Sequence, residues 1–195
     1  MNGSATVVRS GCMAKDADMI LSEFILLGIG GKELSEENAA QTAKALNIIQ
    51  PDFIRVHATG IKLESKLGEF VRDGSFTLQS EEEIVIEQKL FLQQLHEMDS
   101  YYVNEHIVNL LLEVRGNLRA EKQEMLSTID RFLTLPPDER LLFTVGRRLN
   151  IFFCLDNLKK PKLHQKAGES LQQILSKNPH VDFAALCNYV RQSQI

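Results

Sequence analysis

The chain has 195 residues, of which 44% are hydrophobic and 25% are charged, and its formal net charge is -4. This length suits one domain with a hydrophobic core, with or without a helical appendage, and the composition excludes a disordered chain. The negative net charge argues against nucleic acid as a partner. Basic residues also gather only in pairs, such as Arg147-Arg148 and Lys159-Lys160, and form no longer basic cluster.

The sequence also bounds the compartment. No apolar run approaches the ~18 residues that a membrane helix needs, and no apolar signal core is visible near the start, so we expect a cytoplasmic protein without a membrane partner. Cys12, Cys154 and Cys187 are odd in number and far apart, which excludes a disulfide framework and a Cys-x-x-Cys zinc knuckle. A reducing compartment agrees with this cysteine usage.

The first structural signal is an apolar run that ends in glycines. Residues 1–18 are small and polar without a period, and we expect an irregular segment there. The run that follows ends in Phe24-Ile25-Leu26-Leu27 and predicts a buried parallel strand. Gly28-Ile29-Gly30-Gly31 then predicts a tight turn, and Ser35, followed by two glutamates, indicates the N-cap of a helix that ends near residue 47.

A second strand is predicted over residues 53–58, where β-branched residues stand between polar ones. Strand, helix and strand at this spacing form a βαβ unit, whose strands are parallel. Alternation places Arg55 and His57 on the sheet face opposite the covering helices. Because an unpaired buried charge is costly, we expect Glu23 and Arg55 to face each other across the two strands; the equally weighted alternative is an Arg55 that extends to solvent without a partner.

The rest of the chain predicts helices and one further strand. A helix over residues 64–72 should stop at Gly74, and Ser80 with its following glutamates indicates the capping box of a helix that reaches about residue 97. Residues 100–103 predict a short third strand. Further helices are predicted over residues 105–115, 118–134, 137–152, 162–177 and 181–192. The sequence therefore predicts a helix-rich α/β fold.

Two features are candidates for chemistry. The glycine stretch suggests a phosphate contact at a helix start, but it lacks the spacings of dinucleotide-binding and P-loop motifs, so an ordinary turn is the favoured interpretation. His57 is the best functional candidate among the five histidines, because it stands at the carboxyl end of a predicted parallel strand, where α/β folds collect ligands. His106 is expected in the first turn of a helix that Asn104 caps.

Several stretches together resemble the radical SAM enzyme family. Residues 22–31 are similar to the glycine motif of a later strand in that family's barrel, and the likeness runs from about residue 13 into the helical tail. Residues 33–37, 46–55, 74–76, 104–106, 109–111, 130–133 and 135–143 carry it further.

The resemblance implies a fold and a cofactor site. It implies a fragment of a parallel (β/α) barrel with two or three strands over residues 19–104, and a helical C-terminal extension over residues 105–195. It also implies that Gly28, Ile29, Gly30 and Gly31 pass near the adenosyl part of S-adenosylmethionine, with Arg55 and His57 reaching into the barrel lumen. Members of the family hold a [4Fe-4S] cluster on cysteines spaced Cys-x3-Cys-x2-Cys and use it to cleave S-adenosylmethionine.

This chain has no such cysteine triplet. We therefore expect a truncated or split part of a radical SAM protein that is inactive and binds no cofactor by itself. A second chain would supply the missing half of the barrel, or the chain would self-associate. The rival hypothesis is a non-catalytic protein-interaction module derived from the barrel, and a small nucleotide-binding protein that uses the glycine turn alone ranks last.

Overall fold

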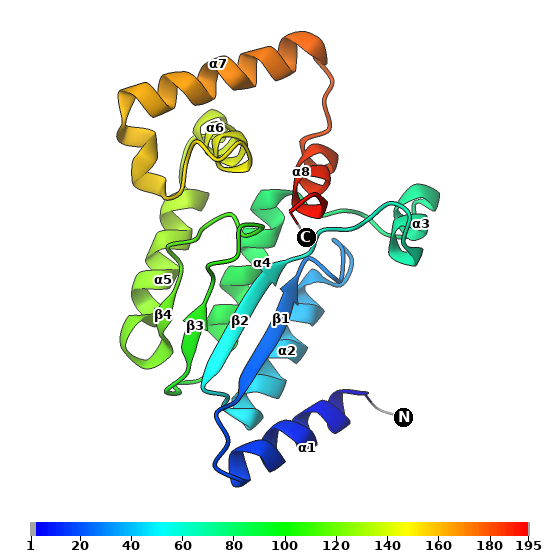
Figure 1. The fold of residues 1–195 in the computed structure, drawn as a ribbon, viewed down its shortest axis with the longest axis vertical. Coiled ribbons are helices and arrows are strands. Elements are labelled where there is room, and N and C mark those ends of the chain that lie inside the picture. Colours follow the sequence, from blue (N-terminus) through cyan, green and yellow to red (C-terminus); the bar gives the residue numbers. More distant parts are fainter. Residues whose placement is uncertain (1–2, 195) are drawn as a thin grey trace.

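The structure of the chain is a computed structural model that describes residues 3–194. It is a helix-rich α/β fold with one open sheet (Figure 1). The strands are β1 (Ser22–Leu27), β2 (Phe53–Ala58), β3 (Tyr101–Val103) and β4 (Gly116–Asn117). The helices are α1 (Gly3–Asp16), α2 (Ser35–Ile49), α3 (Lys66–Asp73), α4 (Glu81–Gln94), α5 (Leu118–Leu133), α6 (Pro137–Arg148), α7 (Pro161–Lys177), α8 (Phe183–Gln192) and the short 3-10 helix η1 (Leu155–Lys159). Within the described residues, no helix combines the length and the apolar character needed to cross a membrane.

The four strands lie side by side in the order in which they occur in the chain. β1, β2 and β3 are parallel, and β4 is antiparallel to β3. β1 and β2 pair along their whole length, from Ser22 opposite Phe53 to Leu27 opposite Ala58. Within residues 3–194, β1 and β4 are therefore the two edges of the sheet. The predicted parallel strands are confirmed, and the antiparallel β4 was not foreseen.

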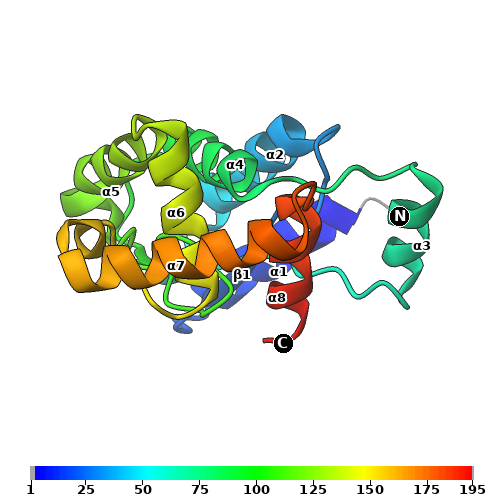
Figure 2. The same ribbon diagram turned by 90° about the horizontal axis from the view of Figure 1, so that it is seen from above.

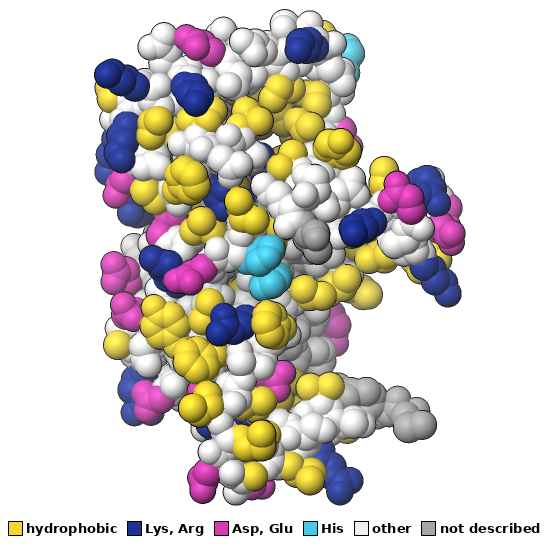
Figure 3. Space-filling view, viewed as in Figure 1, with side chains coloured by type: hydrophobic (Ala, Val, Ile, Leu, Met, Phe, Trp, Pro, Cys, Tyr) yellow, Lys and Arg dark blue, Asp and Glu magenta, His cyan; other side chains and the backbone are white. Residues whose placement is uncertain are grey.

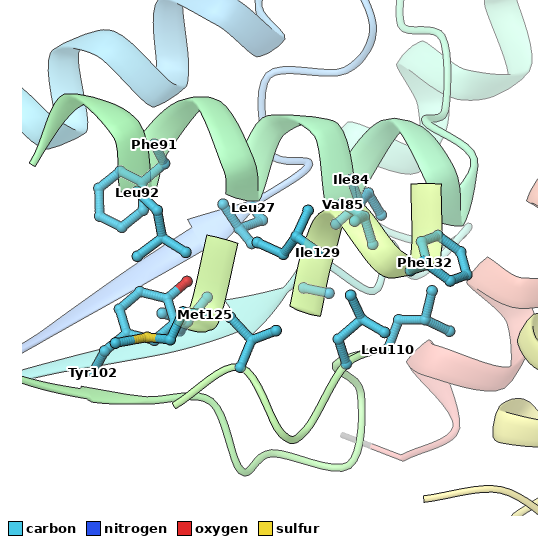
Figure 4. Packing of buried hydrophobic residues seen from close by; sticks show 14 of the residues in the cluster. Leu27, Ile84, Val85, Phe91, Leu92, Tyr102, Leu110, Met125, Ile129 and Phe132 are labelled. Carbon is cyan, nitrogen blue, oxygen red and sulfur yellow. The ribbon is translucent and has the colours of Figure 1, made fainter. Parts of the chain in front are cut away.

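Helices α2, α4 and α5 cover one face of the sheet, as Figures 1 and 2 show from two directions. The hydrophobic core fills the layer between these helices and the strands (Figure 4). Val56 and Tyr102 enter this layer from the strands, and Phe91 and Ile129 enter it from α4 and α5; their side chains are 0% exposed. The opposite face of the strands is open, since Phe24 and Leu26 point to it and remain 64% and 46% exposed.

Local sequence signals set several helix ends. Ser80 and Glu83 form the predicted capping box at the start of α4, in which each side chain accepts a hydrogen bond from the other residue's backbone N–H. Gly74 ends α3 with a left-handed φ of 81°, as predicted. Asn117 caps α5 by accepting hydrogen bonds from two backbone N–H groups. Ser35, in contrast, is not an N-cap; α2 begins after Leu34 without a side-chain cap.

The segment expected to be irregular at the start contains helix α1. Its residues show no strong amphipathic pattern, and the helix is stabilised by contacts with later parts of the chain. Gly11 lies so close to α2 that an added Cβ would be 2.7 Å from the Ile49 side chain. Lys15 forms an ion pair with Asp52 at 2.7 Å. Such tertiary contacts leave no local signal in the sequence.

Residues 105–115 form a loop, and the prediction of a helix there was wrong. Two buried asparagines hold this loop in place. Asn104 donates to the Leu111 carbonyl at 2.6 Å, and Asn109 donates to the Val56 carbonyl and accepts from the Ala58 N–H, both at 2.7 Å. Asparagine side chains that bind backbone groups in this way compete with helix formation. The loop is thereby fastened to the carboxyl end of β2.

Helices α6, α7 and α8 lie beyond the carboxyl ends of the strands (Figure 1). α8 contacts the segment that follows β2. The Asn188 side chain accepts from the Ile61 N–H at 2.8 Å and donates to the Ile61 carbonyl at 3.0 Å. Arg191 donates from Nε to the Thr59 carbonyl at 3.0 Å. These contacts join residues that are 127 and 132 positions apart, so the helical region closes back on the sheet.

Candidate functional site

The glycine turn, residues 28–31, connects β1 to α2. Gly28 and Gly31 have φ values of +83° and +63°, which side-chain-bearing residues rarely adopt. Gly30 lies so close to the next turn of the chain that an added Cβ would be 2.9 Å from the Leu34 carbonyl oxygen. Ile29 is 38% exposed. The geometry of the turn by itself therefore requires all three glycines.

A buried carboxylate from α4 anchors this turn. Glu87 has 0% exposure and accepts hydrogen bonds from the Gly28 N–H at 3.2 Å, from Asn38 Nδ2 at 2.7 Å and from the Ser35 hydroxyl at 3.1 Å. Three donors from the turn and from α2 thus converge on one side chain. Glu87 fixes the position of the turn relative to the covering helices.

This arrangement bears on the phosphate hypothesis. The Gly28 N–H is committed to Glu87, and the Gly31 N–H donates to the Gly28 carbonyl at 3.3 Å. A phosphate bound at the Gly28 N–H would have to displace the Glu87 carboxylate and would lie beside it. The geometry therefore disfavours a nucleotide phosphate bound by the glycine turn alone.

Sequence reasoning missed Glu87, although a signal was present. The residue stands between Ile84 and Phe91 at helical spacing, in the apolar stripe of α4. A charged residue in such a stripe must find buried donors, because an unsatisfied buried carboxylate is costly. The donors themselves, on β1 and α2, could not be identified from the helix.

The open face of the sheet holds Arg55 and two aromatic rings. The Arg55 Nε donates to the Ser22 hydroxyl on β1 at 3.0 Å. Its guanidinium carbon lies 6.0 Å from the centre of the Phe24 ring and 5.9 Å from that of Phe53, within the range of cation–π attraction. The side chain therefore reaches from β2 to β1.

The predicted contact between Glu23 and Arg55 was wrong. In the parallel register Glu23 lies opposite Ile54, whereas Arg55 lies opposite Phe24. Glu23 consequently shares the face of Ile25 and Leu27, which the helices cover, and burial raises the pKa of its carboxyl group. Arg55 lies on the other face, where its nearest polar partner is the Ser22 hydroxyl.

His57 lies near the carboxyl end of β2 on the same open face. Its imidazole stacks on that of His106, with ring centres 4.3 Å apart and planes inclined by 26°, and meets the edge of Phe24 at 5.4 Å. Burial lowers the pKa of His57, and the neighbouring His106 and Arg55 lower it further. His106 comes from the loop after β3 and not from a helix. A stacked imidazole pair is thus available at this end of the sheet.

The structure brings the predicted site residues to one region. Leu27 and Ala58 pair at the carboxyl ends of their strands, so the glycine turn begins directly beside the end of β2, and His57 lies one position earlier. Arg55 is two residues further back on the same face. Figure 3 views this face and shows hydrophobic side chains exposed over the strands around a patch of histidine.

The cysteines of the chain do not fit an iron–sulfur cluster. Cys12 belongs to α1, Cys154 precedes η1, and Cys187 lies in α8, where it is 2% exposed. Burial raises the pKa of Cys187 to about 12, which opposes the thiolate form that binds iron. Within residues 3–194, no group of three or more histidine, cysteine or acidic side chains is placed to hold a metal ion.

Comparisons with protein-family models, with curated proteins and with solved structures found no match.

A second buried charge cluster lies above the carboxyl ends of the strands. Glu81, at the start of α4, is 4% exposed and binds Arg148 of α6, with 3.0 Å between Arg148 Nε and Glu81 Oε1. Arg191 of α8 binds the same carboxylate. Arg147, which precedes Arg148 in α6, is 1% exposed and donates to the Ile107 and Asn109 carbonyls at 3.0 and 3.1 Å. This cluster is structural, because it joins three helices and the β3–β4 loop without exposing a charge.

Proposed function

We propose that the chain is the C-terminal part of a radical SAM-type (β/α) barrel, which acts only when a second chain completes the barrel. The complete assembly would cleave S-adenosylmethionine with a [4Fe-4S] cluster. This chain by itself is inactive, and the cluster belongs to the chain that supplies the missing strands.

The observation that carries the proposal is the one-sided winding of the sheet. Strands β1, β2 and β3 are parallel neighbours in chain order, and α2 and α4 lie on the same face. Successive βαβ units of this kind form the wall of a (β/α) barrel, whereas doubly wound sheets carry helices on both faces. The open face would then be the inner wall, and the free edge of β1 would receive the preceding strand.

The side chains on the open face suit the proposed ligand. Phe24 offers an aromatic surface and Arg55 offers a guanidinium in the first half of their strands, and His57 offers an imidazole near the carboxyl end of β2. An adenine ring packs on aromatic surfaces, and an imidazole can form a hydrogen bond with the polar edge of such a ring. In the completed barrel Gly28, Ile29, Gly30 and Gly31 would border the adenosyl group, while Glu87 holds their backbone in place.

Anaerobic reconstitution tests the proposal. The chain is treated with iron and sulfide, alone and after co-expression with the N-terminal half of a radical SAM barrel that carries the Cys-x3-Cys-x2-Cys loop. We expect cluster absorbance and formation of 5'-deoxyadenosine only in the co-expressed sample. A four-iron cluster and cleavage by the isolated chain would overturn the dependence on a second chain, and failure of the two halves to co-purify would overturn the barrel assignment.

A non-catalytic interaction module is the second candidate, and the exposed apolar side chains of the open face favour it. Phe24 and Leu26 are 64% and 46% exposed on the edge strand β1, and Tyr101 is 41% exposed on β3, two strands away in the same sheet. Such a surface binds other proteins whether or not a reaction follows. A stable complex with a protein that lacks cluster cysteines would support this candidate over the enzyme.

A further inference from the structure

The position of the Arg55 guanidinium defines what can cover the open face. Arg55 belongs to β2, but its Nε binds Ser22 on β1, and its guanidinium carbon lies 6.0 Å from the Phe24 ring on β1 and 5.9 Å from the Phe53 ring on β2, so the charge is held between the two strands on the open face. Neighbouring strands are about 4.8 Å apart. A strand added at the free edge of β1 would therefore place its side chains within reach of this guanidinium.

The charge of Arg55 lacks a counterion in the described part of the chain. Glu23 lies on the opposite face, and Glu105, which follows β3, is paired with Arg115. The histidines on this face do not supply negative charge. The side chains of an added strand would reduce the contact of the Arg55 guanidinium with water, and a desolvated cation without an anion is destabilising. The covering element must bring that anion.

A second copy of this chain is a poor occupant for the same reason. A symmetric contact between two open faces centred on Arg55 would oppose the Arg55 residues of the two copies. Like charges placed opposite each other cost free energy and select against the pairing. The exposed apolar side chains favour the binding of another protein surface to the open face. The positive charge of Arg55 restricts this surface to one that carries an anion.

We propose that the open face is a docking surface for a partner chain that adds a parallel strand beside β1 and presents a carboxylate to Arg55. The inference deepens the proposed function, on which it rests for the existence of a second chain, by assigning the charge of that chain's inner face. It does not depend on the reaction. The partner's strand would alternate, with apolar residues toward α2 and acidic residues toward Arg55.

Two designed peptides of identical length test this assignment. The first alternates valine and glutamate, and the second alternates valine and lysine, so that they differ only in the charge offered to the open face. Each is titrated into the full 15N-labelled chain, and the backbone amide resonances of β1 are followed by NMR. We expect the glutamate peptide to shift these resonances and to bind about fivefold more tightly than the lysine peptide.

Variants of the chain identify the residue responsible. Arg55→Met should abolish the preference for the glutamate peptide, and Arg55→Lys, which keeps the charge, should retain it. Lys162→Met removes one charge from the exposed start of α7 and should leave the preference unchanged. Circular dichroism on each variant shows that the fold is kept.

Equal binding of the two peptides, or no binding of either at about 1 mM, would overturn the inference. So would a wild-type dimer in sedimentation velocity that Phe24→Ser dissociates, since a second copy would then be the occupant. The titration needs neither iron nor S-adenosylmethionine. A positive titration without cleavage in the co-expressed sample would therefore contradict the proposed reaction alone, and cleavage with equal peptide binding would contradict this inference alone.

Discussion

Glu81 and Arg148 are 67 residues apart in the chain and form a buried ion pair with a distance of 3.0 Å between Glu81 Oε1 and Arg148 Nε. Arg191, a further 43 residues along, binds the same carboxylate from α8. Burial by itself would raise the pKa of Glu81, but the two guanidinium groups outweigh it and hold the pKa below its ordinary value. One carboxylate therefore joins α4, α6 and α8.

Glu81→Gln should lower the free energy of unfolding by about 3–5 kcal/mol, because it leaves two buried guanidinium groups without their anion. Urea denaturation followed by circular dichroism measures the change. Glu82→Gln is the matched control, since Glu82 is 43% exposed and pairs with Arg140 at the surface, where such a pair contributes at most about 1 kcal/mol. Equal losses for the two variants would contradict the role assigned to Glu81.

Arg191→Met should detach α8 from the segment that follows β2 while leaving the sheet and its covering helices intact. The variant loses the bond to the Thr59 carbonyl and one guanidinium partner of Glu81. We expect faster amide hydrogen exchange in residues 183–192 and at Ile61, and unchanged exchange in α2. Tyr189→Ala, at a position 64% exposed on the same helix, should leave both regions as in the wild type. Uniformly faster exchange across the chain would indicate global destabilisation instead.

Gly28→Ala should destabilise the protein by about 1–2 kcal/mol, because the residue has a φ of +83° and the added Cβ would lie 3.2 Å from Gln79 Oε1. Gly168→Ala provides the contrast. Gly168 lies within α7, and an added Cβ would meet no atom within 4 Å, so alanine should stabilise that helix by about 0.5–1 kcal/mol. Thermal unfolding of the two variants should thus shift in opposite directions, and a parallel shift would refute the account of the turn.

Acidification should destabilise the wild type through His57. The pKa of this histidine is lower in the folded protein than its ordinary value of 6.5, so below that value the unfolded chain binds the proton more readily and unfolding is favoured. The stabilising contribution of the His57 side chain is present above the pKa that this group has in the unfolded chain. It is lost as the pH falls from that pKa toward the lower pKa of the folded protein. His57→Phe should weaken the pH dependence of the unfolding free energy between about pH 7 and pH 5. His180→Gln, at an exposed position, should leave it unchanged.

Local sequence patterns predict the parts of the fold that are determined by residues close together in the sequence. The second strand was predicted over its observed residues, Phe53–Ala58, because β-branched residues alternate there with polar ones. The capping box at Ser80 was equally readable, since its two hydrogen bonds join residues three positions apart. The grouping of Arg55 and His57 on the uncovered face followed from alternation alone.

The errors arose where distant residues decide. Alternation assigns side chains to the two faces of each strand. Whether Glu23 and Arg55 lie on the same face depends on the register between β1 and β2, which places them on opposite faces. The loop after β3 was mistaken for a helix because its anchor, Asn109, binds a strand more than 50 positions earlier. Glu87 and Glu81, which position the turn and the last helix, likewise find their partners on other elements.

The hydrogen bonds between Asn188 and Ile61 have a consequence for biosynthesis. Translation adds about 5–20 residues per second, so α8 begins to leave the ribosome about 6–25 seconds after the end of β2. Until then Ile61 and Thr59 lack their partners on α8, and Glu81 has Arg148 but not Arg191 available as a partner. The sheet and its covering helices α2, α4 and α5 can form during synthesis. The contacts of the carboxyl ends of the strands with α8 must wait until α8 has been made.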